Sequence, residues 1–316
     1  MRKLVDLKSP VSVRVALKSV PETNWYWETT APTVKEKVDA DNYFAYSREH
    51  AKFLRSVATF REFPVSEVPE VAFVGRSNVG KSSLLNALIG RSVKDLLART
   101  SHKPGCTTTM NLYGVGGNQS NGGVRLEKGD GHRKFDKIVG NGGLLLVDLP
   151  GYGEGSMMEW GTEVMKYFQK RKQLKRVFVL IDAKAGLKDK DLALLATLRL
   201  RNVPHQVILS KLDRIYVPTP APGSIIRHIT PHKPSVVLQP KGSISELNIA
   251  MGDIRDKIQP SAGYGAIGEL LSFSSEVEVD GRNLGLAAVR YAVLTAAEIM
   301  GLWDGQVKKV LSSYIN

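Results

Sequence analysis

The strongest chemical motif of the sequence is a glycine-rich stretch that ends in a lysine and a serine. Residues 75–82, GRSNVGKS, follow the spacing G-x-x-x-x-G-K-[ST], whose glycines let successive backbone N–H groups point at phosphate oxygens. The Lys81 ammonium would neutralise charge on the β and γ phosphates, and the Ser82 hydroxyl would ligate Mg²⁺. The expected phosphate-binding residues are Gly75, Arg76, Ser77, Asn78, Val79, Gly80, Lys81, Ser82 and Ser83.

A second motif places a carboxylate directly after an apolar run. Residues 143–147 are followed by Asp148-Leu-Pro-Gly151, and an aspartate at the carboxyl end of a parallel strand can hold Mg²⁺ through a water molecule. The Gly151 N–H would contact the γ-phosphate, so the segment after it would order with the triphosphate and loosen after hydrolysis. Thr107, in the loop between the two motifs, is our choice for the hydroxyl that completes the Mg²⁺ shell. The expected metal ligands are Ser82, Thr107 and Asp148 through water, and the expected catalytic residues are Lys81, Thr107 and Gly151.

Two further loops carry residues that would select the base. The motif SKLD follows the apolar run 205–209, and the Asp213 carboxylate can accept hydrogen bonds from both N1–H and the exocyclic amine of guanine. Adenine cannot reproduce this pairing. The Lys211 stem would cover the purine face, and the backbone of residues 274–275 could contact guanine O6. The sequence therefore predicts GTP and GDP as ligands, bound by Ser210, Lys211, Asp213, Ser274 and Ser275.

These motifs need a scaffold that ends several strands at one edge. Apolar runs without polar alternation, interleaved with amphipathic stretches, predict an α/β fold: a mostly parallel sheet with helices on both faces. We expect strands at residues 70–74, 143–148, 176–182, 205–210 and 270–273. We expect helices at residues 42–60, 82–90, 157–175, 188–200, 243–258 and 284–300.

The composition limits the class of protein. A chain of 316 residues, 42% of them hydrophobic, can bury a full core, and its one cysteine, Cys106, excludes an internal disulfide and a site built from several thiolates. The apolar stretch 284–300 carries two charges and is shorter than a membrane span, so we expect no transmembrane segment. The net charge of +13 favours contact with a polyanion such as RNA, DNA or anionic lipid, although a merely basic surface stays open.

The N-terminal segment differs from the rest of the chain in its sequence pattern. Residues 1–42 lack sustained periodicity and contain three prolines, so we predict an N-terminal extension outside the folded unit. Its first residues are basic and serine-containing, a pattern typical of mitochondrial transit peptides and also of a disordered basic tail. Residues 43–316 are expected to form one nucleotide-binding domain, a monomer, with surface insertions at about 116–142 and 216–263.

Together these residues resemble the EngB (YihA) family of TRAFAC-class GTPases, which are ribosome-assembly factors. The resemblance covers about residues 52–300 outside the two insertions, and Ser210 and Cys106 stand where the family usually has threonine and lysine. It implies a domain that hydrolyses GTP to GDP and phosphate with Mg²⁺ and docks on large-subunit ribosomal RNA. The extension and insertions resemble the eukaryotic organellar branch, which implies the mitochondrial matrix, with the bacterial cytoplasm as alternative. The sequence blocks that carry the resemblance to the EngB family are GRSNVGKSSLLNAL, ARTSHKPGCTTTMNLY, VDLPGYG, Trp160-Gly161, RVFVLIDAKAGLKDKD, SKLD and SSE.

The rate of hydrolysis depends on the residue after D-x-x-G, which here is Tyr152. Ras-like enzymes have a water-orienting glutamine there, so we expect slow intrinsic turnover until a partner completes the site. In related potassium-activated GTPases the position of Asn78 helps to hold K⁺ between the phosphates, so K⁺ is a second candidate cofactor; a loop-bracing role for Asn78 is equally open. Two alternatives remain: an ATPase or kinase on the same phosphate loop, and a GTP-responsive scaffold that binds rRNA with little turnover.

Overall fold

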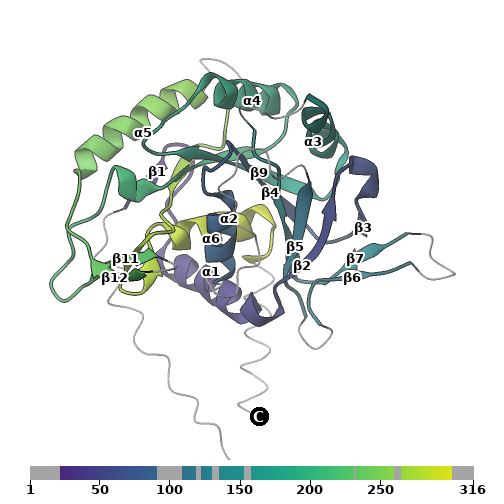
Figure 1. The fold of residues 1–316 in the computed structure, drawn as a ribbon, viewed down its shortest axis with the longest axis horizontal. Coiled ribbons are helices and arrows are strands. Elements are labelled where there is room, and N and C mark those ends of the chain that lie inside the picture. Colours follow the sequence, from purple (N-terminus) through teal and green to yellow (C-terminus); the bar gives the residue numbers. More distant parts are fainter. Residues whose placement is uncertain are drawn as a thin grey trace, which may run out of the picture.

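The centre of the fold is an eight-stranded sheet in the order β1-β13-β10-β9-β4-β8-β5-β2 (Figure 1). The computed structural model describes residues 22–90, 109–118, 122–129, 135–152, 158–230, 233–259 and 265–300. Five neighbouring strands run parallel, and the three outer ones are antiparallel to their neighbours. The predicted α/β class with a mostly parallel sheet is therefore confirmed. The parallel strands are β4 (Glu70–Gly75), β8 (Gly143–Asp148), β9 (Leu174–Asp182), β10 (His205–Ser210) and β13 (Glu269–Ser272); the others are β1 (Trp25–Tyr26), β2 (Lys52–Val57) and β5 (Met110–Gly116).

Helices cover both faces of this sheet because its central strands are apolar on both sides. In β4, Val71 and Phe73 belong to the core on one face, whereas Ala72 and Val74 belong to the core on the other. Each large side chain buried in this way contributes about 1.5–3 kcal/mol to stability. In Figure 1, helices α1 (Val34–Ser47), α2 (Lys81–Ile89) and α6 (Leu286–Ala296) lie on one face, and α3 (Met158–Lys170), α4 (Asp189–Leu200) and α5 (Ile244–Ile258) lie on the other.

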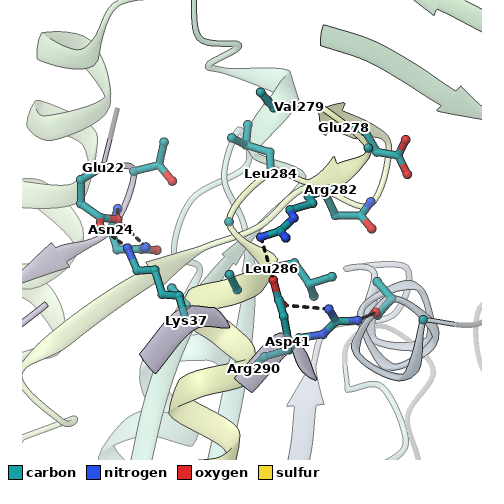
Figure 2. A pocket seen from close by; sticks show the side chains of 18 of the residues that line it. Glu22, Asn24, Lys37, Asp41, Glu278, Val279, Arg282, Leu284, Leu286 and Arg290 are labelled. Carbon is teal, nitrogen blue, oxygen red and sulfur yellow. Dashed lines mark hydrogen bonds and ion pairs between the residues drawn. The ribbon is translucent and has the colours of Figure 1, made fainter. Parts of the chain in front are cut away.

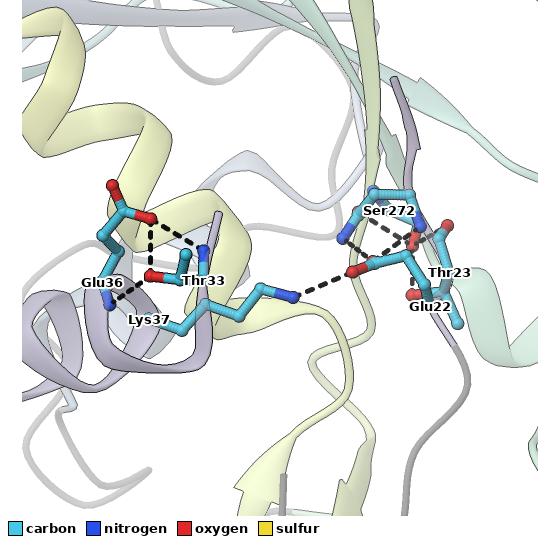
Figure 3. Close-up of polar contacts among 7 residues, drawn as sticks. Glu22, Thr23, Thr33, Glu36, Lys37 and Ser272 are labelled. Atoms are coloured by element: carbon cyan, nitrogen blue, oxygen red, sulfur yellow. Dashed lines mark hydrogen bonds and ion pairs between the residues drawn. The ribbon is translucent and has the colours of Figure 1, made fainter. Parts of the chain in front are cut away.

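The N-terminal boundary predicted at residue 42 is wrong, because residues 22–42 are part of the fold. Strand β1 pairs antiparallel with β13, and the Ser272 hydroxyl donates to the Thr23 carbonyl at 2.8 Å (Figure 3). Helix α1 begins after Thr33, whose side chain forms a capping box with Glu36. The prolines that suggested an extension lie outside this helix. Residues 1–21, which contain the predicted transit-peptide pattern, lie outside the described residues.

The helix predicted at residues 42–60 is also only partly correct. Helix α1 ends at Ser47, and β2 then forms the edge of the sheet by pairing antiparallel with β5. The Arg55 guanidinium on this strand lies 2.7 Å from the Asp136 carboxylate. Pairing with β5 overrides the local helix preference of the segment, as tertiary context often does.

Both predicted insertions contribute strands to small sheets that are separate from the central one. In the first, β6 (Arg125–Glu127) and β7 (Lys137–Val139) pair with each other, and β7 pairs with β3 (Val65–Ser66). In the second, β11 (Ile226–Thr230) and β12 (Lys233–Val237) join β14 (Val277–Val279) and β15 (Arg282–Asn283) in a four-stranded antiparallel sheet. Strand β14 follows the second predicted base-binding loop directly, and β11 follows the first one after residues 215–225.

An ionic cluster joins α1, α6 and the end of α2. Asp41 accepts hydrogen bonds from Arg290 at 2.9 Å and from Arg282 at 3.2 Å (Figure 2). Arg290 also donates to the Ala87 and Leu88 carbonyls, both at 2.9 Å. These carbonyls belong to the last turn of α2, where a helix leaves acceptors unsatisfied, and that of Ala87 also accepts from the Gly90 N–H at 3.0 Å. The helix that begins at the phosphate loop is therefore held in place at its other end.

Candidate nucleotide-binding site

The glycine-rich stretch forms the turn between β4 and α2. Gly80 precedes the helix with φ 102°, a left-handed conformation that glycine adopts without steric cost. The turn closes with a hydrogen bond from the Val79 N–H to the Arg76 carbonyl at 3.2 Å, and the Lys81 ammonium lies 3.5 Å from the Gly75 carbonyl. The N–H groups of the first turn of α2 have no partners inside the helix, so together with the helix dipole they can bind phosphate oxygens.

Asp148 has the properties expected of a group that binds Mg²⁺ through water. Its Oδ1 atom is buried and makes no hydrogen bond to any described residue. Burial raises the pKa of Asp148 to about 6, with the Lys81 ammonium opposing the shift. Burial also lowers the pKa of Lys81, and here the Asp148 carboxylate opposes the shift. A buried carboxylate oxygen without a partner, next to an ammonium, fits a hydrated Mg²⁺ that is shared with phosphate oxygens.

Of the two other predicted metal ligands, Ser82 lies in the described part of the chain and Thr107 does not. Ser82 lies in the first turn of α2, directly after the phosphate loop. Thr107 lies within residues 91–108, outside the described part of the chain, so its role stays a prediction. The described residues thus fit a Mg²⁺ ion that would be held by the Ser82 hydroxyl and, through water, by Asp148.

The segment after Asp148 pairs with the phosphate loop. The Tyr152 N–H donates to the Gly75 carbonyl at 3.3 Å, and the Ser77 N–H donates to the Tyr152 carbonyl at 3.1 Å. A Cβ atom on Gly151 would lie 3.0 Å from the Ser77 Cα, a separation that real side chains rarely show. Glycine makes this close approach without displacing the loop, so the structure brings Gly151 next to the phosphate loop, and its contact with a γ-phosphate stays a prediction.

The Tyr152 side chain is buried and bound to Asp191, so it is not placed to orient a water molecule. Its side chain is only 7% exposed, and its hydroxyl donates to Asp191 Oδ1 at 2.7 Å. Arg76 Nε lies 3.4 Å from Asp191 Oδ2, so the buried Asp191 in the first turn of α4 holds both residues. Burial, together with the Asp191 charge, raises the pKa of Tyr152 well above its ordinary value. The phenol therefore stays protonated and bound to α4.

The two predicted base-binding loops lie in direct contact. Asp213 sits in a short 3₁₀ turn, Leu212–Arg214, after Lys211 in the left-handed conformation. The Leu212 N–H donates to the Phe273 carbonyl at 3.1 Å, and the buried Ser274 hydroxyl donates to Asp213 Oδ1. The structure therefore brings Asp213 and Ser274 together, as the base-binding prediction requires.

Two side chains join the base-binding turn to the phosphate loop. The Ser210 hydroxyl donates to the Val79 carbonyl at 2.7 Å, and the Lys211 ammonium donates to the Asn78 carbonyl at 2.6 Å. Serine at position 210 thus supplies the hydroxyl for this contact, although the family resemblance favours threonine there. The phosphate and base subsites form one hydrogen-bonded unit.

Asp182 is part of the site but lies outside the motifs that predicted it. Its carboxylate lies 3.0 Å from the Lys211 ammonium and 3.2 Å from the Arg214 guanidinium. Although burial alone would raise the pKa of Asp182, hydrogen bonds from Lys211 and the Ala185 N–H, with the charges of Lys211 and Arg214, lower it. The signal was present: Asp182 ends an apolar strand, as Asp148 does. Asp182 orients the lysine of the base motif.

The fold and these loops define the class of the protein as a P-loop GTPase domain. A family model described as "50S ribosome-binding GTPase" matches residues 70–211. The EngB GTP-binding protein of Mesorhizobium japonicum is 41% identical over 170 residues, which cover 52% of this chain and 71% of that protein. The chain belongs to the EngB family of GTP-binding proteins.

Two further comparisons show how much of each related protein this chain covers. The EngB protein of Bradyrhizobium diazoefficiens is 38% identical over 169 residues, so the chain spans 66% of the length of that relative. A crystal structure of a GTP-binding protein EngB is similar to 72% of this chain and 98% of that chain, with 16% identity and a TM-score of 0.38. Among the described residues, no helix is both long and apolar enough to cross a membrane.

Proposed function

We propose that this chain binds GTP with Mg²⁺, hydrolyses it to GDP and phosphate, and acts in the assembly of the large ribosomal subunit. The observation that carries the first part is the position of Asp213, held by Ser274 at the same edge of the sheet as Lys81 and Asp148. The description of the matching family model and the net charge of +13 support a ribosomal partner.

Hydrolysis by the isolated protein is expected to be slow. The phenol at position 152 is hydrogen-bonded to Asp191 and cannot orient a water as a carboxamide does. We expect large ribosomal subunits to raise GTP turnover by about tenfold or more, because a partner that completes the site supplies the missing stabilisation. The measurement is steady-state phosphate release with and without subunits. Subunit binding without any rise in turnover would support the GTP-responsive scaffold instead, and fast hydrolysis by the isolated chain would contradict the proposal.

The RNA contact itself is expected to be electrostatic. Binding to subunits should weaken by at least about tenfold between 50 and 200 mM salt, since phosphate contacts release counterions. Within the first insertion, Arg125 is paired with Glu127 at 2.6 Å and Lys137 with Glu67 at 2.9 Å, whereas Lys128 is exposed. Lys128 is therefore the described residue of this insertion best placed to meet RNA phosphate.

A monovalent cation is part of the same proposal. Asn78 is exposed and adopts φ 62°; its carbonyl accepts from Lys211, whereas its side chain makes no hydrogen bond to any described residue, which favours the cation-binding role over a bracing one. Its side-chain oxygen is therefore available to a cation that bridges the phosphates. We expect turnover to rise by about tenfold when K⁺ replaces Na⁺, and Asn78→Ala to abolish that rise while GDP affinity is kept. Equal turnover of the wild type in the two salts would remove K⁺ from the account.

We place the protein in the mitochondrial matrix, with the bacterial cytoplasm as the alternative. The support is the basic, serine-containing pattern of residues 1–20 and the presence of insertions in the nucleotide-binding domain. Fusion of residues 1–42 to a fluorescent reporter tests the targeting directly. Mitochondrial import of the reporter is the expected result, and a diffuse reporter would contradict this location. We also propose that the chain acts as a monomer.

A further inference from the structure

The second sheet, together with the rest of the insertion that supplies two of its strands, contacts both loops that are proposed to recognise the base. Its strands β11 and β12 come from the insertion after the Asp213 turn, and its strands β14 and β15 follow the Ser274–Ser275 loop. Because β11 pairs with β14, the insertion is joined by backbone hydrogen bonds to the chain that leaves the second loop. One structural unit therefore reaches both sides of the base subsite.

Lys241 makes the contact with the first loop. Its ammonium donates to the Arg214 carbonyl at 2.6 Å and lies 3.5 Å from the Asp213 carbonyl. Its backbone is held by a two-way pairing with Val217, with N–H to carbonyl distances of 2.8 and 3.0 Å. The last carbonyls of a helical turn lack partners within the turn, and a cation is favourable there. Lys241 therefore closes the carboxyl end of the turn that carries Asp213.

The insertion contacts the second loop at Glu276. The Ile229 N–H donates to the Glu276 carbonyl at 2.7 Å, and the His228 ring lies 3.2 Å from the Glu276 carboxylate. The Glu276 N–H donates to the Ser274 hydroxyl at 3.1 Å, and that hydroxyl donates to Asp213 Oδ1. Hydrogen bonds at Glu276 and Ser274 thus connect β11 to the Asp213 carboxylate, which would bind guanine.

We propose that the insertion fixes the position of the Asp213 carboxylate, with Lys241 as the positioning residue that holds its backbone. This inference rests on the proposed role of Asp213 in guanine recognition. Lys241 does not touch the nucleotide in this account. It sets the affinity for the guanine base by keeping the 3₁₀ turn in place, while the chemistry at the phosphates is left unchanged.

The consequence is a change in binding without a change in catalysis. When Lys241 is replaced by alanine, the Asp213 turn loses its anchor, and the two hydrogen bonds from guanine to Asp213 become misaligned. We expect GDP to bind about tenfold more weakly, with a matching rise in KM for GTP and an unchanged kcat. Inosine diphosphate lacks the exocyclic amine and makes only one of these hydrogen bonds, so its affinity should fall less.

The test measures dissociation constants for GDP and inosine diphosphate on the full chain. The variants are Lys241→Ala, Lys241→Arg, which keeps a cationic donor, and Lys257→Ala, a control at an exposed lysine of α5. The expected result is a reduced preference for GDP in Lys241→Ala alone, restored in Lys241→Arg. Equal loss of both ligands together with a lower unfolding temperature would show a merely structural role and overturn the proposal.

A further variant separates this inference from the function on which it rests. Asp213→Asn should lose its preference for guanine if Asp213 reads the base. If it does so while Lys241→Ala binds GDP as the wild type does, the positioning role is wrong and the base assignment stands. If Asp213→Asn keeps full guanine preference, the base assignment fails and the inference fails with it.

Discussion

Replacement of Lys81 by alanine is expected to lower kcat/KM for GTP by about two to three orders of magnitude. The ammonium lies in the phosphate loop beside Asp148, where it would neutralise charge that develops on the transferring phosphoryl group. Removal of one such group from a preorganised site costs about a hundredfold to a thousandfold in rate. Steady-state phosphate release over a range of GTP concentrations measures the effect.

The fold is expected to survive this change. Within the described residues the Lys81 ammonium makes one long hydrogen bond, 3.5 Å to the Gly75 carbonyl, and burial lowers its pKa, so the charge is not a major source of stability. Lys172→Ala provides the control, because Lys172 is exposed in the turn between α3 and β9. Turnover within about twofold of the wild type in Lys81→Ala would contradict the assigned phosphate site.

The second large expected effect is on recognition of the guanine base. Asp213→Asn is expected to weaken GDP binding by about a hundredfold, which corresponds to the loss of a charge-assisted pair of hydrogen bonds. The carboxamide places an N–H₂ group where guanine also presents an amine, so two donors face each other. Xanthine carries a carbonyl at that position, and we expect xanthosine diphosphate to bind the variant more tightly than GDP. Competition against a fluorescent nucleotide measures both affinities.

The contact with Ser274 makes this substitution informative. The Ser274 hydroxyl donates to Asp213 Oδ1, and the carbonyl oxygen of asparagine can accept the same hydrogen bond. The turn should therefore keep its geometry, and the change in specificity should report the chemistry of the side chain alone. An unfolding temperature equal to that of the wild type checks this. A variant that still prefers GDP to xanthosine diphosphate would show that Asp213 does not face the base.

The parallel core of the fold could be predicted from sequence because its strands are apolar on both faces. The predicted strands at residues 143–148 and 205–210 coincide with β8 and β10. The phosphate loop and Asp148 could be located because loops at the carboxyl edge of such a sheet collect ligand-binding groups. The contact of Asp213 with Ser274 follows from the same rule, since their strands β10 and β13 are neighbours.

The antiparallel edges could not be predicted, because their pairing depends on distant segments. Strand β2 has no clean alternation, and Phe53 on it is 48% exposed, so only its pairing with β5 makes it a strand. Strand β1 has two residues, and the two residues before it, Thr23 and Asn24, contact Ser272, about 250 positions along the chain. The spacing of Thr33 and Glu36 fits a capping box, so the start of α1 has a local signal, which the prediction of an extension did not use.

The role of Lys241 had no signal in the sequence. It lies 28 positions from Asp213, in a stretch rich in proline and glycine that predicted only a surface insertion. An isolated backbone pairing of Lys241 with Val217, outside the four-stranded sheet, brings it back to the base-binding turn. Contacts of this kind arise from tertiary structure and not from a local motif.

The central claim is that this site selects guanine nucleotides. Its most direct test is equilibrium competition of GTP, GDP and ATP against fluorescent GDP on the full chain with Mg²⁺. GTP and GDP are expected to displace the probe, and ATP is expected to leave it bound at about a thousandfold higher concentration, because adenine cannot form the paired hydrogen bonds with Asp213. Displacement by ATP at concentrations similar to those of GTP would contradict the claim.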